Sequence, residues 1–173
     1  MRMRLTNMEL TALSRTGYST RPNKIVYIFA YVYLALFAAA AICYLLAGMS
    51  LFDAVCHAMS VVSTGGFSTR GRSIAAFDSR VVEAVTMLFM YLASIHFGII
   101  YISFVTRSLK PLRNPVIKFY TISIIVTALI LSVGLHKSAG GWGGALWQSL
   151  FSTLCISSTT GFAIVDNASW PMW

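Results

Sequence analysis

Two stretches of the chain combine hydroxyl-bearing residues and glycine in a pattern that could bind a dehydrated cation. Ser63–Phe67 reads S-T-G-G-F and Ser158–Phe162 reads S-T-T-G-F, with Thr159 lying 95 positions after Thr64. Backbone carbonyl oxygens that face a cavity can replace the hydration shell of an ion. Threonine and serine hydroxyls add oxygen ligands, and glycine allows backbone angles that other residues avoid. Neither stretch contains a carboxylate, so we predict selection of a monovalent rather than a divalent ion.

The two motifs belong to a longer internal repeat. Residues 51–69, LFDAVCHAMSVVSTGGFST, align without a gap with residues 146–164, LWQSLFSTLCISSTTGFAI. Each motif follows an apolar run of about 12 residues, which as a helix would span about 18 Å, little more than half of a hydrocarbon core. These runs, Leu51–Val62 and Leu146–Ser157, are predicted to be short re-entrant helices. Ordinary glycine-rich turns between membrane helices are the alternative, but two copies behind half-length helices favour pore loops.

The composition places these loops in a membrane. Of the 173 residues, 57% are hydrophobic and 10% are charged, with a mean hydropathy of +0.74. A soluble domain could not cover so much apolar surface with so few charges. Three runs are long enough to cross a bilayer, which needs about 20 apolar residues: Ile25–Gly48, about Arg80–Thr106 and about Val116–Leu135. The predicted fold class is therefore an all-α membrane protein with span–pore helix–span repeats and re-entrant filter loops.

The predicted organisation follows from the order of these segments. We expect a cytoplasmic connector, a complete span–pore–span repeat, a cytoplasmic loop, and a second repeat that lacks its closing span. The corresponding residues are 1–24, 25–107, 108–115 and 116–173.

The basic residues set the expected orientation. A cluster lies between the second and third spans, at Arg107, Lys110, Arg113 and Lys118. The positive-inside rule places this cluster in the cytoplasm, so both short helices should enter from the outer side. The net charge of +8 then reflects membrane orientation rather than nucleic acid binding. Three arginines lie outside in this arrangement and count against it, although they are fewer than the inner set: Arg70, Arg72 and Arg80. Arg70 and Arg72 lie just outside the predicted filter, where their charge should repel a cation. Pairing with Asp78, or snorkelling to lipid headgroups, would reduce that effect.

Local signals mark where helices begin and end. Gly48 suits a helix C-terminus, and Ser50 followed by Asp53 predicts a capping box that opens the first short helix. Asp78 or Ser79 can cap the second span.

Several further residues have two interpretations each. His96, within the second span, could act on the ion or bond a neighbouring helix. His57 is expected to pack or to make a hydrogen bond near the outer side. Glu83 could attract cations or stabilise the helix start. The cysteines are odd in number and contain no C-x-x-C pair, so we interpret them as buried apolar residues: Cys43, Cys56 and Cys155.

The repeat resembles the TrkH/KtrB/HKT superfamily of potassium transporters, and within it the bacterial TrkH-type potassium-uptake subunits. The run AGMSLFDAVCHAMSVVSTGGFSTRGRSIAAFDS is similar to the second pore region of that family, and SSTTGFAIVDNASWP is similar to the third. The resemblance covers almost the whole chain. It implies four span–pore–span repeats around one pore, so the missing repeats of the same polypeptide would complete the pathway. It also implies a homodimer, a cytoplasmic nucleotide-binding regulatory subunit, and a multi-pass position in the bacterial inner membrane.

The resemblance also assigns residues and an ion. The filter glycines of the family correspond to Gly66 and Gly161, and potassium is the expected ion. The candidate potassium ligands are Ser63, Thr64, Gly65, Gly66, Ser158, Thr159, Thr160 and Gly161. We expect membrane lipid around the protein, no organic cofactor, no nucleic acid partner and no enzymatic reaction. Two alternatives stay open: a sodium-permeable relative, or a membrane-embedded enzyme or assembly subunit whose glycine-rich loops only turn the chain.

Overall fold

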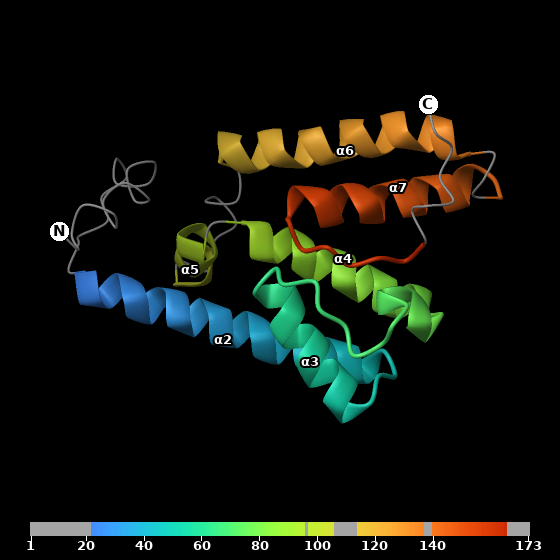
Figure 1. The fold of residues 1–173 in the computed structure, drawn as a ribbon. Helices are drawn as coiled ribbons and strands as arrows, with labels where there is room; N and C mark the ends of the chain where they lie inside the picture. The colour runs from blue at the N-terminus through green and yellow to red at the C-terminus, as the bar shows by residue number, and fades with distance from the viewer. Residues whose placement is uncertain (1–21, 96, 106–113, 137–139, 166–173) are drawn as a thin grey trace.

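The computed structural model describes residues 22–95, 97–105, 114–136 and 140–165. The described residues form helices joined by turns and loops, without a strand. In chain order the helices are α2 (Pro22–Leu46), α3 (Leu51–Val62), a short 3₁₀ helix η2 (Ser73–Phe77), α4 (Arg80–Ser94), α5 (Phe97–Val105), α6 (Pro115–Leu135) and α7 (Trp142–Ser157). The long helices α2 and α6 lie on opposite sides of the molecule, α4 and α7 lie between them, and α3 packs against α2 (Figure 1).

Two helices are long and apolar enough to cross a membrane. They contain the stretches Val26–Leu46 and Pro115–Leu135, each with a mean hydropathy of 2.2. Helix α6 begins with Pro115 in its first turn, and the side chain of Asn114 accepts a hydrogen bond from the backbone N–H of Val116. Both features suit a helix start, because the first N–H groups have no partner inside the helix. Large apolar side chains on both helices are exposed, as suits contact with lipid: Tyr27, Leu34, Phe119 and Ile130.

The second predicted span is not one continuous helix, because the run is divided into α4 and α5. Helix α4 ends at Ser94, Ile95 is extended (φ −77°, ψ 137°), and α5 then runs in another direction (Figure 1). The hydroxyl of Ser94 donates to the carbonyl of Met90, and the N–H of Ile95 bonds to Leu92. A serine hydroxyl bound to a carbonyl four residues back bends a helix, and a bond to the residue three back tightens its last turn. His96 lies outside the described residues.

Capping residues fix where the first short helix begins. Gly48 has a φ of 93° and ends the turn that follows α2. The Ser50 hydroxyl accepts a hydrogen bond from the backbone N–H of Asp53 at 3.1 Å and donates to the Asp53 carboxylate at 2.9 Å. These contacts confirm Ser50 as the N-cap of α3. The reciprocal contact differs from that of a capping box, because the Asp53 carboxylate bonds the Ser50 hydroxyl. Helix α3 has 12 residues, so it is about 18 Å long and cannot cross a membrane.

The start of α4 agrees with the sequence prediction, whereas that of α7 differs slightly. Ser79 caps α4, where its side chain accepts from the Val82 N–H at 3.5 Å, whereas Asp78 lies in the preceding turn with a φ of 43°. Of the two candidate caps, Ser79 is therefore the one that acts. Helix α7 begins at Trp142, four residues before the predicted Leu146, and extends to Ser157.

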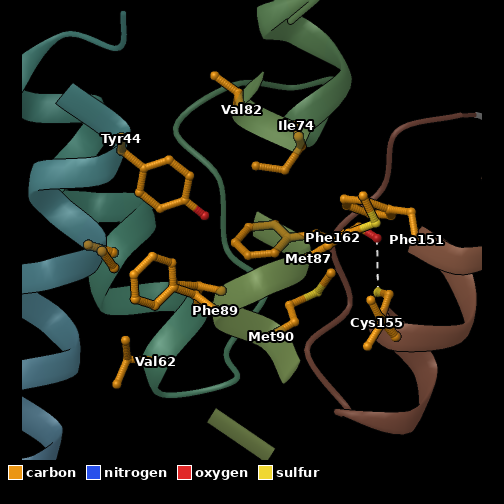
Figure 2. Packing of buried hydrophobic residues seen from close by; sticks show 14 of the residues in the cluster. Tyr44, Val62, Ile74, Val82, Met87, Phe89, Met90, Phe151, Cys155 and Phe162 are labelled. Carbon is orange, nitrogen blue, oxygen red and sulfur yellow. Dashed lines mark hydrogen bonds between the residues drawn. The ribbon is translucent and has the colours of Figure 1, made fainter. Parts of the chain in front are cut away.

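The hydrophobic core joins the two repeats. Tyr44 of α2, Phe89 of α4 and Phe151 of α7 are buried in one cluster, together with Phe162 (Figure 2). The Tyr44 hydroxyl and the Thr86 hydroxyl are 3.0 Å apart and satisfy each other inside this core. Helix α3 packs on α2 and α7 packs on α6, while α4 touches both short helices. This arrangement brings the ends of α3 and α7, and the loops that follow them, to the centre of the molecule.

Candidate ion-binding site

The two Ser-Thr-x-Gly-Phe loops have the same pattern of backbone conformation. The φ angle is 53° at Thr64 and 57° at Thr159, and it is 67° at Gly66 and 90° at Gly161. Each pair of residues is separated by the repeat offset of 95 positions. Positive φ is uncommon for residues other than glycine and is costly for a β-branched side chain. Two threonines with this conformation at equivalent positions indicate that the two loops share one backbone conformation.

The short helices end through identical hydrogen bonds. After α3, the N–H of Gly65 bonds to the Ser60 carbonyl at 2.7 Å and that of Thr64 bonds to Val61 at 3.2 Å. After α7, Thr160 bonds to Cys155 at 3.0 Å and Thr159 bonds to Ile156 at 3.0 Å. This pair of contacts is a Schellman motif, in which glycine normally occupies the left-handed position that threonine holds here. The chain therefore leaves the helical state immediately before each predicted ion-binding glycine.

The loops touch each other at one of the two glycines. A Cβ atom on Gly66 would lie 1.9 Å from the backbone oxygen of Thr160, so any side chain there would force the loops apart. A Cβ on Gly161 would meet no atom within 4 Å, although its φ of 90° still disfavours a side chain. A Cβ on Gly65 would lie 3.3 Å from the Phe67 ring and from the Ser63 hydroxyl, both of which are side-chain atoms. Gly66 is therefore the most restricted of the three.

The polar groups of the second loop are more enclosed than those of the first. The hydroxyls of Ser158 and Thr160 are buried and lie 2.7 Å apart. Thr159 is exposed. In the first loop Ser63 is exposed and donates to the Ser60 carbonyl at 3.3 Å, and Thr64 is half-buried. The structure thus brings the eight candidate residues together in two adjoining loops, with Thr64 and Thr159 accessible.

The phenylalanines that end the two motifs have opposite surroundings. Phe162 is 4% exposed, and its ring stacks on the imidazole of His57 with 6.0 Å between ring centres. The thiol of Cys155 donates to the Phe162 carbonyl at 3.0 Å (Figure 2). Phe67, at the equivalent position, is 81% exposed. The second loop is therefore held against the first repeat by packing, and the first loop has no such contact among the described residues.

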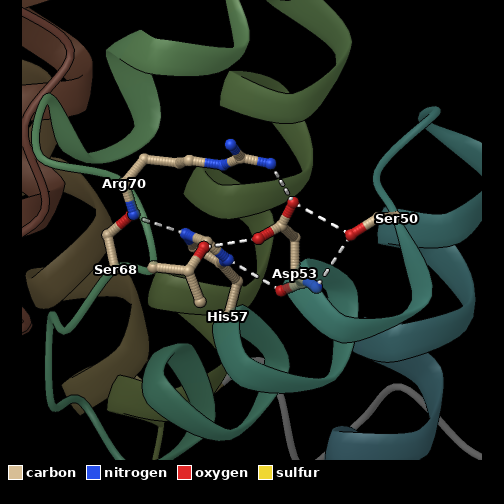
Figure 3. Close-up of polar contacts among 6 residues, drawn as sticks. Ser50, Asp53, His57, Ser68 and Arg70 are labelled. Atoms are coloured by element: carbon tan, nitrogen blue, oxygen red, sulfur yellow. Dashed lines mark hydrogen bonds and ion pairs between the residues drawn. The ribbon is translucent and has the colours of Figure 1, made fainter.

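A polar network supports the first loop on its outer side, and we call it the Asp53 network. It consists of Ser50, Asp53, His57, Ser68, Thr69 and Arg70 (Figure 3). The Asp53 carboxylate accepts from the Thr69 hydroxyl at 2.5 Å and from the Arg70 guanidinium at 2.7 Å, besides the Ser50 hydroxyl. Pairing with Asp78 is one of the two expected ways to reduce the charge of the outer arginines, but Arg70 pairs with Asp53 instead. Sequence reasoning missed this partner, although the carboxylate stood one turn from His57 in the same helix.

Hydrogen bonds stabilise the charged form of Asp53, which lies outside the two membrane-spanning helices. The bond from Thr69 contributes most, followed by the bond from Arg70, and together they lower the pKa of Asp53 to about 2. Burial opposes this shift without cancelling it. The carboxylate is therefore ionised at neutral pH.

His57 links the same two segments by a second route. Its Nδ1 lies 2.7 Å from the Asp53 carbonyl, and since a carbonyl can only accept, Nδ1 carries a proton. Its Nε2 lies 2.8 Å from the Ser68 hydroxyl oxygen. The same oxygen accepts a hydrogen bond from the Arg70 backbone N–H at 3.1 Å. The ring is fully buried and packs edge-on against Phe77. This confirms the prediction that His57 packs and makes a hydrogen bond.

Glu83 is engaged in contacts between the repeats. Its carboxylate accepts from Arg80 at 3.1 Å and from the indole N–H of Trp147. The Arg80 guanidinium also lies over the Trp147 ring. These contacts join the first turn of α4 to the second turn of α7. Glu83 lies in the first turn of α4, as the helix-start interpretation requires. Within the described ranges, no group of three or more His, Cys, Asp or Glu residues could hold a metal ion.

Comparison with known proteins gives a consistent result. The family model TrkH, described as a cation transport protein, matches residues 17–172. The Trk system potassium uptake protein TrkH of Vibrio parahaemolyticus is 31% identical over 149 residues, covering 83% of this chain and 30% of the relative. The Trk system potassium uptake protein TrkG of Escherichia coli is 36% identical over 132 residues, covering 75% of this chain and 27% of the relative.

A solved structure has the same fold. The crystal structure of the potassium transporter TrkH from Vibrio parahaemolyticus superposes with a TM-score of 0.81 at 30% sequence identity, over 90% of this chain and 35% of that one. The chain therefore spans about a third of the length of the proteins it matches.

Proposed function

The chain belongs to the TrkH family of cation transport proteins, and from this premise we propose that its two loops form part of a potassium uptake pathway. Its relatives are named as potassium uptake proteins. The ligands would be the candidate residues Ser63–Gly66 and Ser158–Gly161, mainly through backbone carbonyl oxygens. Because the chain spans about a third of its relatives, these two loops would form only part of the wall around the ion.

The observation that carries this proposal is the repeated backbone conformation of loops that touch. Left-handed threonines cost on the order of 1–2 kcal/mol each compared with the usual conformation. Such strain persists where it serves a function. Here it occurs at Thr64 and Thr159, next to the contact between Gly66 and Thr160. Residues of positive φ alternate with Gly65 and Thr160, which lack it, and this alternation can turn successive carbonyl oxygens towards one side.

The chemistry of the loops favours an alkali cation. Neither loop contains a carboxylate, and Asp53, in the helix that precedes the first loop, is already paired with Arg70. Neutral carbonyl dipoles and hydroxyls suit a weakly hydrated monovalent ion, whereas divalent ions in proteins are usually held by carboxylates. Dehydration of the ion would be offset by these oxygens as it passes.

The assembly follows from the same family assignment. We propose that further repeats of the same polypeptide complete the pore, that the protein lies in the bacterial inner membrane, and that it works as a homodimer with a cytoplasmic nucleotide-binding subunit. Support comes from the resemblance of the loops and from relatives that are named as Trk system components.

Rubidium uptake by the full-length protein tests the proposal. The protein would be expressed in cells that lack their own potassium uptake, with an empty vector as background. We expect saturable Rb⁺ uptake that excess K⁺ suppresses and equal Na⁺ does not. Equal suppression by Na⁺ would favour the sodium-permeable alternative. Absence of uptake, with the protein present in the membrane and its regulatory subunit co-expressed, would contradict a role in transport.

A further inference from the structure

The Asp53 network connects two parts of the first repeat that must keep a fixed separation if the loop is to hold an ion. Asp53 lies in the first turn of α3, before the loop, whereas Thr69 and Arg70 lie in the segment that leaves the loop after Gly66. The Asp53 carboxylate bonds both of them, at 2.5 Å and 2.7 Å (Figure 3). The loop between is thus closed at its base by side chains.

We propose that Asp53 is a positioning residue for the first ion-binding loop, which it holds in place through Thr69 and Arg70 while compensating the charge of Arg70. This inference rests on the proposed function. Asp53 does not touch the ion. It acts by fixing the segment that follows Gly66, and so it fixes where the oxygen atoms of Ser63–Gly66 lie.

The geometry suits a rigid support. The side chain of Asp53 is 5% exposed, so its bonds meet little competition from water. His57 provides a parallel connection between the Asp53 carbonyl and Ser68. Arg70 also lies over the ring of Phe77, 5.9 Å from its centre. Hydrogen bonds to an ionised carboxylate are stronger than bonds between neutral groups, and several of them together hold their partners more firmly than one does.

The charge of Arg70 gives the network a second effect. The Arg70 side chain is 55% exposed on the side predicted to face the outside, where free positive charge would repel cations. Its guanidinium is 2.7 Å from the Asp53 carboxylate, so the pair is close to neutral as seen from a distance. Removing Asp53 would therefore both loosen the loop and uncover a positive charge.

The second loop has no counterpart of this network. Gln148 and Ser152 stand at the positions of Asp53 and His57, and the positions of Ser68, Thr69 and Arg70 carry apolar residues, Ala163, Ile164 and Val165. The segment after Gly161 instead receives backbone contacts from the first repeat, where the Ser73 hydroxyl accepts from the Ala163 N–H and the Ala75 N–H donates to the Ala163 carbonyl. The positioning role of Asp53 is thus specific to the first loop.

The test compares four variants of the full-length protein at equal membrane abundance. They are Asp53→Asn, Arg70→Gln, the double variant, and Thr69→Val, which removes one hydroxyl from an exposed residue and so preserves the fold. Rb⁺ uptake and its suppression by Na⁺ are measured for each. We expect Asp53→Asn to lower uptake by about tenfold or more and to weaken Rb⁺/Na⁺ discrimination, because it leaves Arg70 unpaired. Thr69→Val should weaken discrimination by a smaller factor.

The double variant separates positioning from charge. Removal of Arg70 should restore part of the uptake lost in Asp53→Asn, because the uncovered positive charge is gone, while discrimination stays impaired. Glu83→Gln is the matched control, since it removes one outer acidic charge without touching the loop, and its discrimination should equal that of the wild type.

Three results would overturn the inference. They are normal discrimination in both Asp53→Asn and Thr69→Val, no recovery in the double variant, or an equal loss of discrimination in Glu83→Gln. A wild-type protein that fails to take up Rb⁺ would instead refute the proposed function, so the two failures can be told apart.

Discussion

The first and second loops have one backbone conformation and two different kinds of support. The first loop is held by the Asp53 network, in which charged and hydroxyl side chains of its own repeat bond one another. The second loop is held by packing of Phe162 on His57 and by contacts of Ala163 with the first repeat. Even the phenylalanines of the shared motif differ, with Phe67 exposed and Phe162 buried.

This difference indicates which features the function requires. The positive φ angles at Thr64, Gly66, Thr159 and Gly161 are common to both loops, whereas the supporting side chains are not. A feature retained while its surroundings change is the one under direct constraint. The backbone of the loops therefore carries the proposed ion binding, and the supports are separate solutions to the same positioning problem.

The largest expected effect is that of Gly66→Ala. A Cβ here would overlap the Thr160 oxygen at 1.9 Å, so the loops must separate, and positive φ adds on the order of 1–2 kcal/mol of strain. We expect Rb⁺ uptake to fall to background. A Cβ on Gly161 would meet open space, so Gly161→Ala should lose only part of the Rb⁺ uptake. Gly65→Ala should lose the least Rb⁺ uptake of the three variants. An equal loss in Gly65→Ala and Gly66→Ala would show that crowding between the loops is not what matters.

Phe162→Ala should have the next largest effect. Truncation of a buried phenylalanine costs about 3–5 kcal/mol of stability, and here it also removes the ring that stacks on His57. We expect a lower Tm of the purified full-length protein and reduced uptake. Phe162→Leu, which keeps most of the apolar volume, serves as the control. Its decrease in Tm should be less than half of that of Phe162→Ala. If both variants melted like the wild type, the packing account of the second loop would fail.

Thr64→Gly and Thr159→Gly should have smaller and matching effects on stability. Glycine relieves the strain of a positive φ but gains freedom in the unfolded chain, so each change should stabilise the protein by about 0.5–1 kcal/mol. Each also removes a hydroxyl from the proposed site, so Rb⁺/Na⁺ discrimination should weaken. Thermal unfolding and competitive uptake would be measured on the same preparations. Opposite signs of the stability change in the two loops would break the equivalence of their backbones.

The smallest expected effect concerns pH and the Asp53 network. In the folded protein the pKa of Asp53 is about 2, below the value of about 3.9 in an unfolded chain. Asp53 therefore contributes stability that is fully present above about pH 5 and is lost progressively as pH falls towards 2. The difference in Tm between the wild type and Asp53→Asn should be the same at pH 7 and pH 5. A difference that shrinks over this interval would mean that Asp53 is protonated more easily than its hydrogen bonds suggest.

Features that depend on neighbouring residues in the chain were predictable from the sequence. The capping of α3 by Ser50 follows from a hydroxyl placed three residues before Asp53. The placement of glycine at position 66 is indicated by the glycine at the equivalent position 161, and both have positive φ. The contact of Gly66 with Thr160, by contrast, joins distant parts of the chain.

Changes in helix direction, and contacts between residues far apart in the chain, were not predictable from the sequence. The break at Ile95 falls inside an evenly apolar run, and hydropathy carries no information on where a helix turns. The pairing of Arg70 with Asp53 joins residues 17 positions apart through the curvature of the loop. The opposite burial of Phe67 and Phe162 arises because only Phe162 has a neighbouring repeat on the relevant side among the described residues.

The position of Phe162 has a consequence for the order in which the protein is made. Its stacking partner His57, and the groups of Ser73 and Ala75 that hold Ala163, all belong to the earlier part of the chain. The bonds of Asp53 to Thr69 and Arg70 can form as soon as that part leaves the ribosome, because N-terminal units generally fold first. The later loop can then pack against a first repeat that is already folded. A folding defect at His57 would therefore extend beyond the first repeat to the Phe162 segment, which is synthesised later.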